Sequence, residues 1–170
     1  MYKRVLFIVL MFNALVGHAQ NQSLKFEHSG KKEGLSQLNI GCIIQDSRGF
    51  IWVGTRDGLS KYDGYNFTNF KHDSQDPTSL SSSMVADIVE DKEGNIWIAT
   101  IIGLNKLERR SGTFKKYMHN DKDPTSLSDN ILNKLTVDEK GNIWVGSQGG
   151  LDYFDTKLNK FTKHFKNNPK

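Results

Sequence analysis

Histidines are the first side chains of this sequence to test for chemistry. Downstream of the N-terminal stretch they are His28, His72, His119 and His164. They are scattered, and His72 and His119 each follow an equivalent phenylalanine by five residues, so we interpret them as repeated structural residues on an outer strand. No thiol–imidazole pair, phosphate-binding glycine loop or metal-ligand spacing accompanies them. The sequence therefore predicts no catalytic residue, no metal site and no cofactor.

Two acidic loops and three tryptophans are the remaining candidates for binding chemistry. Loops 73–76 and 121–123 lack the alternating acids that end in Gly and a bidentate Glu, so solvated turns are favoured over calcium sites. Trp52, Trp97 and Trp144 have the shape to stack on sugar rings, but each stands at the same place in an apolar pattern, which favours a core role. Ligand contacts are therefore expected elsewhere.

The tryptophans mark an internal repeat. They are 45 and 47 residues apart; each follows an Asp by six residues and a Gly by three, and precedes a Gly-Leu pair by six. A joint, Asp-Pro-Thr-Ser-Leu-Ser, occurs at 76–81 and again at 123–128. A tandem array of one structural unit explains this pattern. The shared residues, interpreted as structural, are Asp46, Gly49, Trp52, Gly58, Asp91, Gly94, Trp97, Gly103, Asp138, Gly141, Trp144 and Gly150.

The first half of each unit reads as a hairpin of two strands. β-branched residues dominate 38–46, and the Asp-x-x-Gly that follows suits a tight turn, because the Asp side chain bonds the backbone ahead and Gly accepts positive φ. The second strand, 51–55, is apolar or small on both faces, so we expect it to be covered on both sides. Its position 54 holds only Gly or Ala across the units, as expected where a neighbouring sheet approaches closely.

The second half of each unit supplies two more strands. The third begins at Leu59, Leu104 or Leu151, and the fourth carries an aromatic pair such as Phe67 and Phe70. Four strands in about 45 residues predict an all-β fold made of β-propeller blades, each a four-stranded antiparallel sheet. No segment has a 3.6-residue apolar period long enough for a helical repeat. The expected parts are a signal peptide at 1–19, a lead-in at 20–33, and blades at 34–78, 79–125 and 126–170.

The N-terminus predicts export. Lys3 and Arg4 precede an apolar stretch over 5–16, and small residues follow, which predicts cleavage between Ala19 and Gln20. An uncleaved anchor is the alternative, and the polar start of the mature chain disfavours it.

Charge and cysteine content add little beyond this. Without Lys3 and Arg4, 21 basic residues stand against 19 acidic ones, a net charge of +2, and we expect no nucleic-acid partner. The single cysteine, Cys42, forms no intrachain disulfide, so stability must come from burial.

The repeated pattern Asp-x-x-Gly-x-Ile-Trp-(Val/Ile)-(Gly/Ala)-(Thr/Ser)-x-x-Gly-Leu, with its Asp-Pro-x-Ser-Leu-Ser joint, resembles the two-component regulator propeller repeat over about residues 34–166. The resemblance implies the N-terminal part of the periplasmic sensor region of a hybrid sensor histidine kinase. Such sensors have two successive seven-bladed propellers, a β-sandwich, a membrane helix and cytoplasmic kinase, receiver and DNA-binding parts. The phosphoacceptor histidine lies in the kinase domain, so no residue here is assigned that role.

The resemblance implies a seven-bladed ring, and three blades are present. Three blades do not close a ring, since propellers use about four to eight. A piece of a longer product, a broken gene and a subunit that completes its ring by association stay open as explanations. Two terminal apolar faces would then be exposed, and we expect residues 20–170 alone to associate or to be poorly packed.

Ligand contacts are expected where the units differ. The two residues after the second strand are Arg56-Asp57 in the first unit, Ile101-Ile102 in the second and Gln148-Gly149 in the third. These loops should share a face with the joints, because alternate loops of an up-and-down sheet lie on one side. Arg56, Asp57 and Gln148 are the ligand-binding candidates there.

The innermost strand supplies a second candidate surface. Cys42, Asp87 and Lys134 are equivalent positions of the strand that lines a propeller channel. Asp87 and Lys134 are interpreted either as an inter-blade ion pair or as polar ligand contacts.

The sequence thus favours a periplasmic sensor propeller that binds an oligosaccharide and relays binding across the membrane by a shape change or dimer rearrangement. Its expected partners are that ligand, the remaining blades and downstream domains, and a second copy of the full sensor. An extracellular propeller enzyme, such as a lyase or glycosidase, and a structural adhesion module are the alternatives. A pair of carboxylates in one cleft would support an enzyme, yet Asp46, Asp91 and Asp138 sit in hairpin turns.

Overall fold

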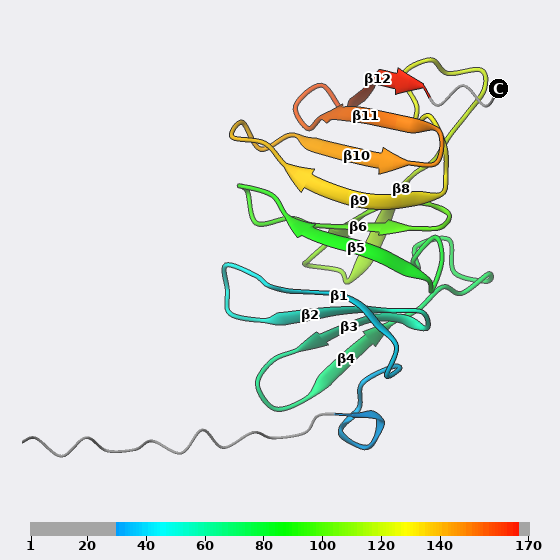
Figure 1. Ribbon diagram of the computed structural model, residues 1–170. Helices are drawn as coiled ribbons and strands as arrows, with labels where there is room; N and C mark the ends of the chain where they lie inside the picture. Colours follow the sequence, from blue (N-terminus) through cyan, green and yellow to red (C-terminus); the bar gives the residue numbers. More distant parts are fainter. Residues whose placement is uncertain (1–29, 167–170) are drawn as a thin grey trace, which may run out of the picture.

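The computed structural model describes residues 30–166, which form three four-stranded antiparallel sheets, each built from strands consecutive in the chain (Figure 1). A 3₁₀ turn, η1 (Lys31–Glu33), precedes them. The first sheet holds β1 (Ile40–Gln45), β2 (Ile51–Thr55), β3 (Gly58–Tyr62) and β4 (Phe67–Phe70). The second holds β5 (Val85–Glu90), β6 (Ile96–Thr100), β7 (Gly103–Glu108) and β8 (Thr113–Tyr117). The third holds β9 (Leu132–Val137), β10 (Ile143–Ser147), β11 (Gly150–Asp155) and β12 (Lys160–Lys166).

The prediction of an all-β fold made of four-stranded blades is confirmed. β2, β6 and β10 coincide with the predicted second strands, and the third strands begin one residue before the predicted leucines. The Asp-x-x-Gly turns also form as expected: Asp46 Oδ1 accepts hydrogen bonds from the N–H groups of Arg48 and Phe50, and Gly49 has φ +86°. Among residues 30–166, no helix is long and apolar enough to span a membrane. The predicted signal peptide and its Ala19–Gln20 cleavage site lie outside the described residues.

The sheets stack face to face, with their inner strands β1, β5 and β9 side by side (Figure 1). One apolar cluster fills the space between the first two sheets, where Trp52 packs with Leu107 and Phe114. A second cluster fills the next space, where Trp97 packs with Phe154 and Phe161. Each sheet therefore covers the tryptophan of the preceding unit, which is why Trp52 and Trp97 are only 1% exposed.

The close approach predicted at position 54 is present. A Cβ on Gly54 would overlap Cys42 Sγ on the neighbouring strand and lie 2.6 Å from Val85 Cγ1 of the next sheet. The equivalent Ala99 is fully buried. Gly146 has more room, because its nearest neighbour would be Lys134 O at 3.7 Å.

Each joint is attached to the sheet that follows it by a buried leucine and a backbone hydrogen bond. Leu80 and Leu127 are fully buried. The next residue donates its N–H to a buried polar side chain on the third strand: Ser81 to Asn105 Oδ1 at 2.9 Å, and Ser128 to Asp152 Oδ2 at 2.8 Å. The repeated Ser-Leu-Ser motif thus joins each sheet to the segment that leads into it.

Candidate functional site

The loops after the second strands and the joints share one face of the molecule, as the sequence predicted. Gly58 donates its N–H to Ser83 O at 2.7 Å, and Gly103 donates to Asn130 O at 2.7 Å. Gln148 donates its N–H to Ile131 O at 3.0 Å. We call this surface, formed by residues 56–57, 71, 82–84, 101–102, 118, 129–131 and 148–149, the loop face.

In the first unit the loop face is charged. The Arg56 side chain is exposed, and Asp57 Oδ2 lies 2.7 Å from Lys71 Nζ, with both side chains about half exposed. Solvent-exposed pairs of this kind contribute little to stability. Arg56 and Asp57 are therefore accessible polar groups rather than parts of the core.

In the second unit the loop face is apolar; the sequence analysis gave Ile101-Ile102 for this loop but missed the exposed Met118. Ile102 and Met118 occupy the positions of Asp57 and Lys71, and they are 40% and 43% exposed. Met84 and Ile131, which each follow a joint by three residues, are also exposed. Aligning the residues after the fourth strands, Lys71 with Met118, would have revealed the change from charge to apolar surface.

In the third unit Gln148 is exposed on this face. The three loop candidates Arg56, Asp57 and Gln148 thus lie on one face but on two different blades. Their side chains are accessible to a ligand large enough to cover more than one blade.

The inner strands bring the other two candidates together. Lys134 Nζ lies 3.5 Å from Asp87 Oδ1, and Asp87 Oδ2 accepts a 2.9 Å hydrogen bond from the N–H of Leu135. Asp87 is nearly buried, whereas the Lys134 side chain is 75% exposed. The pair therefore joins the second and third sheets, as one of the two sequence interpretations has it. A ligand contact by these residues stays a prediction.

Cys42 lies beside this pair. Burial, followed by the nearby Asp87 carboxylate, raises the pKa of its thiol from 9.0 to about 11. Because the thiolate is the reactive form, Cys42 stays protonated and unreactive at neutral pH.

At the opposite end of the sheets, the hairpin aspartates bind the tryptophans. Trp52 Nε1 donates to Asp46 Oδ2 at 2.9 Å, and Trp97 Nε1 donates to Asp91 Oδ2 at 2.8 Å. The six-residue spacing between Asp and Trp has this physical cause. Sequence reasoning placed both residues in the scaffold but did not predict the bond between them.

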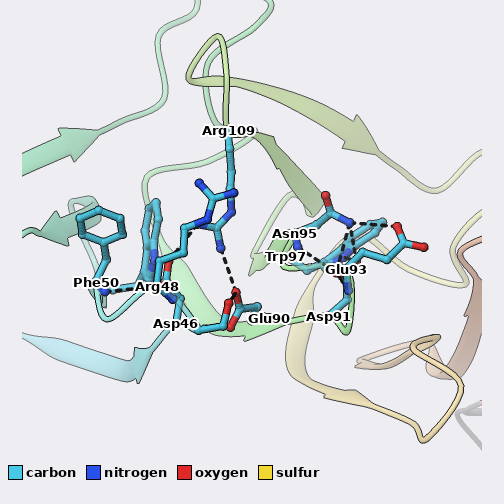
Figure 2. A network of polar contacts seen from close by, with 11 residues as sticks. Asp46, Arg48, Phe50, Glu90, Asp91, Glu93, Asn95, Trp97 and Arg109 are labelled. Carbon is cyan, nitrogen blue, oxygen red and sulfur yellow. Dashed lines mark hydrogen bonds and ion pairs between the residues drawn. The ribbon is translucent and has the colours of Figure 1, made fainter.

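Arg109 joins the first two sheets at this end (Figure 2). Its Nη1 lies 2.9 Å from Asp46 Oδ2, and its Nη2 lies 3.0 Å from Glu90 Oε1. Glu90 also accepts hydrogen bonds from the N–H and hydroxyl of Ser47 in the first sheet's hairpin. Burial alone would raise the pKa of Asp46, but hydrogen bonds from Trp52, Arg109 and the backbone outweigh it and lower the pKa.

The third unit departs from this pattern, and the predicted core role of Trp144 needs correction. Trp144 is partly exposed, and within residues 30–166 its Nε1 does not bond Asp138. Asp138 Oδ2 instead accepts a 3.3 Å hydrogen bond from the Tyr153 hydroxyl. The centroid of the Trp144 ring lies 4.9 Å from those of the Tyr153 and His164 rings. The physical reason is that no further sheet of the described residues covers this face.

The repeated histidines hold the joints, and they lie just after the outer strands rather than on them. His72 Nδ1 is 2.8 Å from Leu80 O, and His119 Nδ1 is 2.6 Å from Leu127 O. His28 lies outside the described residues. Across residues 30–166, no group of three or more His, Cys, Asp or Glu side chains is placed to hold a metal ion.

The stacked four-stranded sheets define this chain as a protein of β-propeller blades. A family model described as "two component regulator propeller" matches residues 34–57 and 79–101. The first two blades therefore carry two-component regulator propeller repeats.

Similar proteins point to the same class. The chain is 42% identical over 74 residues to histidine kinase P4 of Formosa agariphila. The aligned segment covers 44% of this chain and 5% of the kinase. The extracellular domain of a hybrid two-component system from B. thetaiotaomicron is 31% identical, with a TM-score of 0.76 over 82% of this chain and 20% of that one. A second such domain from the same organism is 22% identical, with a TM-score of 0.66 over 86% of this chain and 21% of that one, and it supports the fold alone. This chain thus spans between 5% and 21% of the length of these relatives.

Proposed function

We propose that this chain is part of the ligand-sensing propeller of a two-component sensor and works on the periplasmic side of the membrane. The observation that carries the proposal is the 31% identity to the extracellular domain of a hybrid two-component system across 82% of this chain. The signal sequence expected at the N-terminus is consistent with it. Catalysis is not part of the proposed role.

The loop face is the proposed ligand surface, and an oligosaccharide is the proposed ligand. Exposed guanidinium, carboxylate and amide groups, here Arg56, Asp57 and Gln148, are donors and acceptors that suit sugar hydroxyls. The exposed side chains of Ile102 and Met118 offer apolar surface between them. Binding would be relayed by a shape change or dimer rearrangement rather than by covalent chemistry.

Direct binding tests this proposal. A panel of labelled oligosaccharides is titrated with the chain and with the variant Arg56→Ala/Asp57→Ala/Gln148→Ala. We expect saturable binding of at least one glycan and a loss of at least about tenfold in affinity in the variant, since hydrogen bonds to charged groups are worth about 1.5–3 kcal/mol. Lys140→Ala, an exposed cation on the β9–β10 turn at the far end of the sheets, is the matched control and should bind as the parent does.

The outcomes separate the alternatives. Appearance of new reducing ends or unsaturated products would establish an enzyme in place of a sensor. Absence of binding across the panel would reject the oligosaccharide ligand. The same substitutions in the full-length sensor should weaken its response, and an unchanged response would reject the loop face as the ligand surface.

Asp87 and Lys134 are tested separately. If they contact ligand, Lys134→Met weakens glycan binding. If they only join the blades, the same change lowers unfolding stability and leaves glycan affinity unaltered. Lys134 is the better site to change, because its side chain is mostly exposed and Asp87 also accepts a backbone bond.

A further inference from the structure

A small hollow lies between the first and second sheets at the end opposite the loop face. Arg48, Lys61 and Arg109 line it, together with the rings of Trp52 and Phe70. Its volume is about 80 Å³, several times the roughly 10–15 Å³ that one water molecule requires. The hollow is therefore large enough for a compact polar group.

The cations at this hollow outnumber the carboxylates that face them. Arg109 is bound through its two Nη atoms by Asp46 and Glu90, and its Nε is buried without a hydrogen-bond partner in the described chain. Arg48 and Lys61 form no ion pair with any carboxylate of residues 30–166. Three cationic groups thus line one hollow, and the carboxylates bound to them are Asp46 and Glu90, both on Arg109. The exposed Asp63 carboxylate lies near enough to Lys61 to interact with it electrostatically but forms no ion pair with it.

The two carboxylates are already fully engaged. Asp46 accepts from the N–H groups of Arg48 and Phe50 as well as from Trp52 and Arg109. Glu90 accepts from Ser47 and Arg109. Neither is therefore free to neutralise the Arg48 and Lys61 side chains.

The arrangement of the cations also favours a shared ligand. Arg48 and Arg109 both line the hollow, and their side chains converge in Figure 2. Lys61 Nζ lies over the Phe50 ring, 3.7 Å from its centroid, a cation–π contact that positions the ammonium group. Like charges that line one small hollow repel each other, and an anion bound between them would offset that repulsion.

This cluster is not part of the common scaffold. At the junction of the second and third sheets, Glu93, Lys106 and Thr156 occupy the positions of Arg48, Lys61 and Arg109. That junction has one cation and one acid at these three positions. The excess of positive charge is confined to the first junction, which gives the molecule an internal control.

We propose that this hollow binds one oxyanion group, a carboxylate or a sulfate, through Arg48, Lys61 and Arg109. Guanidinium groups match the planar oxygens of such anions and form charge-assisted hydrogen bonds with them. The site lies at the end of the sheets where Arg48 occupies the first Asp-x-x-Gly hairpin, with Lys61 on β3 and Arg109 in the β7–β8 turn, and not on the loop face. It therefore does not depend on the proposed oligosaccharide surface, and each stands or falls by its own experiment.

Indole NMR signals of the full chain provide the test. The three tryptophans give three Nε1–H signals, and that of Trp52 reports on the hollow through its hydrogen bond to Asp46. Sodium sulfate, sodium glucuronate and neutral glucose are titrated at constant ionic strength, and signals are assigned with Trp97→Phe and Trp144→Phe. We expect a saturable shift of the Trp52 signal alone with sulfate or glucuronate, and none with glucose.

Charge variants locate the effect. Arg48→Glu places in the first junction the residue type that the second junction has, on an exposed side chain whose change should not disturb folding. It should weaken anion affinity at least about tenfold, the loss of one charge-assisted hydrogen bond. Lys61→Met should weaken it as well, whereas Lys106→Met at the second junction should leave it unchanged.

Each outcome decides a point. A response to sulfate alone assigns the site to a tetrahedral oxyanion, and a response to glucuronate alone assigns it to a carboxylated sugar. Shifts that do not saturate, that appear equally at all three indoles, or that persist in both Arg48→Glu and Lys61→Met overturn the proposal.

Discussion

Asp46 and Asp91 each use one carboxylate oxygen to close a hairpin and the other to fix a tryptophan. Asp91 Oδ1 accepts from the N–H groups of Glu93 and Asn95, while Oδ2 accepts from Trp97 Nε1. The turn and the core are thereby tied through a single side chain. An aspartate at this position thus serves packing between sheets as well as turn geometry.

Replacing Asp91 with alanine should be strongly destabilising. It leaves the buried Trp97 Nε1–H and two turn N–H groups without their acceptor, and a buried unsatisfied donor costs about 1–3 kcal/mol. We expect a loss of about 2–4 kcal/mol in unfolding free energy, measured by urea denaturation. Asp138→Ala is the matched control, because Asp138 does not bond Trp144; a loss as large there would contradict the role given to the tryptophan bond.

His119 should make stability depend on pH. Hydrogen bonds, first to Leu127 O and then to Asp121, raise the pKa of His119 above its usual 6.5. Because the folded-state pKa is raised, this contribution is fully present below about pH 6.5 and is lost as the pH rises through the folded value.

The measurement is the unfolding midpoint between pH 5 and pH 8, for the parent and for His119→Gln. The variant should lose the additional stability that the parent has at acidic pH. His72→Gln is the control, since His72 makes the same contact to a joint carbonyl and lacks the aspartate partner in the described chain. An identical pH profile for parent and His119→Gln would reject the assignment.

At the scale of the strand, β1 and β2 pack tightly where they meet the second sheet. Gly54 faces Cys42 and Val85, and the inner strands β1 and β5 share a register shift at equivalent places, Ile40/Cys42 and Val85/Asp87. Such a bulge changes where the following side chains point. The inner strand is therefore less regular than its sequence suggests.

Gly54→Ala should cost about 1–3 kcal/mol, the usual range for adding a methyl group to a filled core. Gly146→Ala should be close to neutral, because its Cβ would meet nothing nearer than 3.7 Å. Both effects are read from chemical denaturation. Partial recovery in the double variant Gly54→Ala/Cys42→Ala would identify Cys42 Sγ as the obstructing atom, and equal costs for Gly54→Ala and Gly146→Ala would refute the packing argument.

The elements whose signals are local were predictable. The hairpins, the second strands and the shared side of the loops follow from Asp-x-x-Gly, from Ile-Trp and from strand alternation. Two contacts between units were also predictable, because the Asp87–Lys134 pair and the close approach at Gly54 involve equivalent positions of the repeat. Other contacts between units were not, because they join residues far apart that do not recur. Arg109 meets Asp46 across 63 positions of sequence, and its counterparts are Gly64 and Thr156. Trp144 stands at the same repeat position as Trp52, yet it is partly exposed, because burial at this position requires a following sheet that covers the ring.

At the scale of the whole molecule, apolar side chains are buried between the sheets but exposed on the outer faces of the first and third sheets. Between sheets, apolar side chains such as Ile88 and Ile98 are almost fully buried. On the outer face of the first sheet Ile43 is 62% exposed, and on the third sheet Phe165 is 69% exposed. Leu151 and Trp144 lie on the same outer face as Phe165, since residues opposite each other in antiparallel strands share a face.

These outer faces should make the full chain associate in solution. Apolar patches of a few hundred Å² are near the most that monomers usually expose, and burial of apolar surface is worth about 25 cal/mol per Å². Light scattering after size exclusion should show oligomers whose mass rises with concentration, and Ile43→Glu with Phe165→Glu should shift the chain toward monomer. Tyr65→Glu, which changes an 89% exposed side chain in the β3–β4 turn, should leave the association unchanged. A monodisperse monomer at every concentration would mean that these faces pack in some way other than against a second copy.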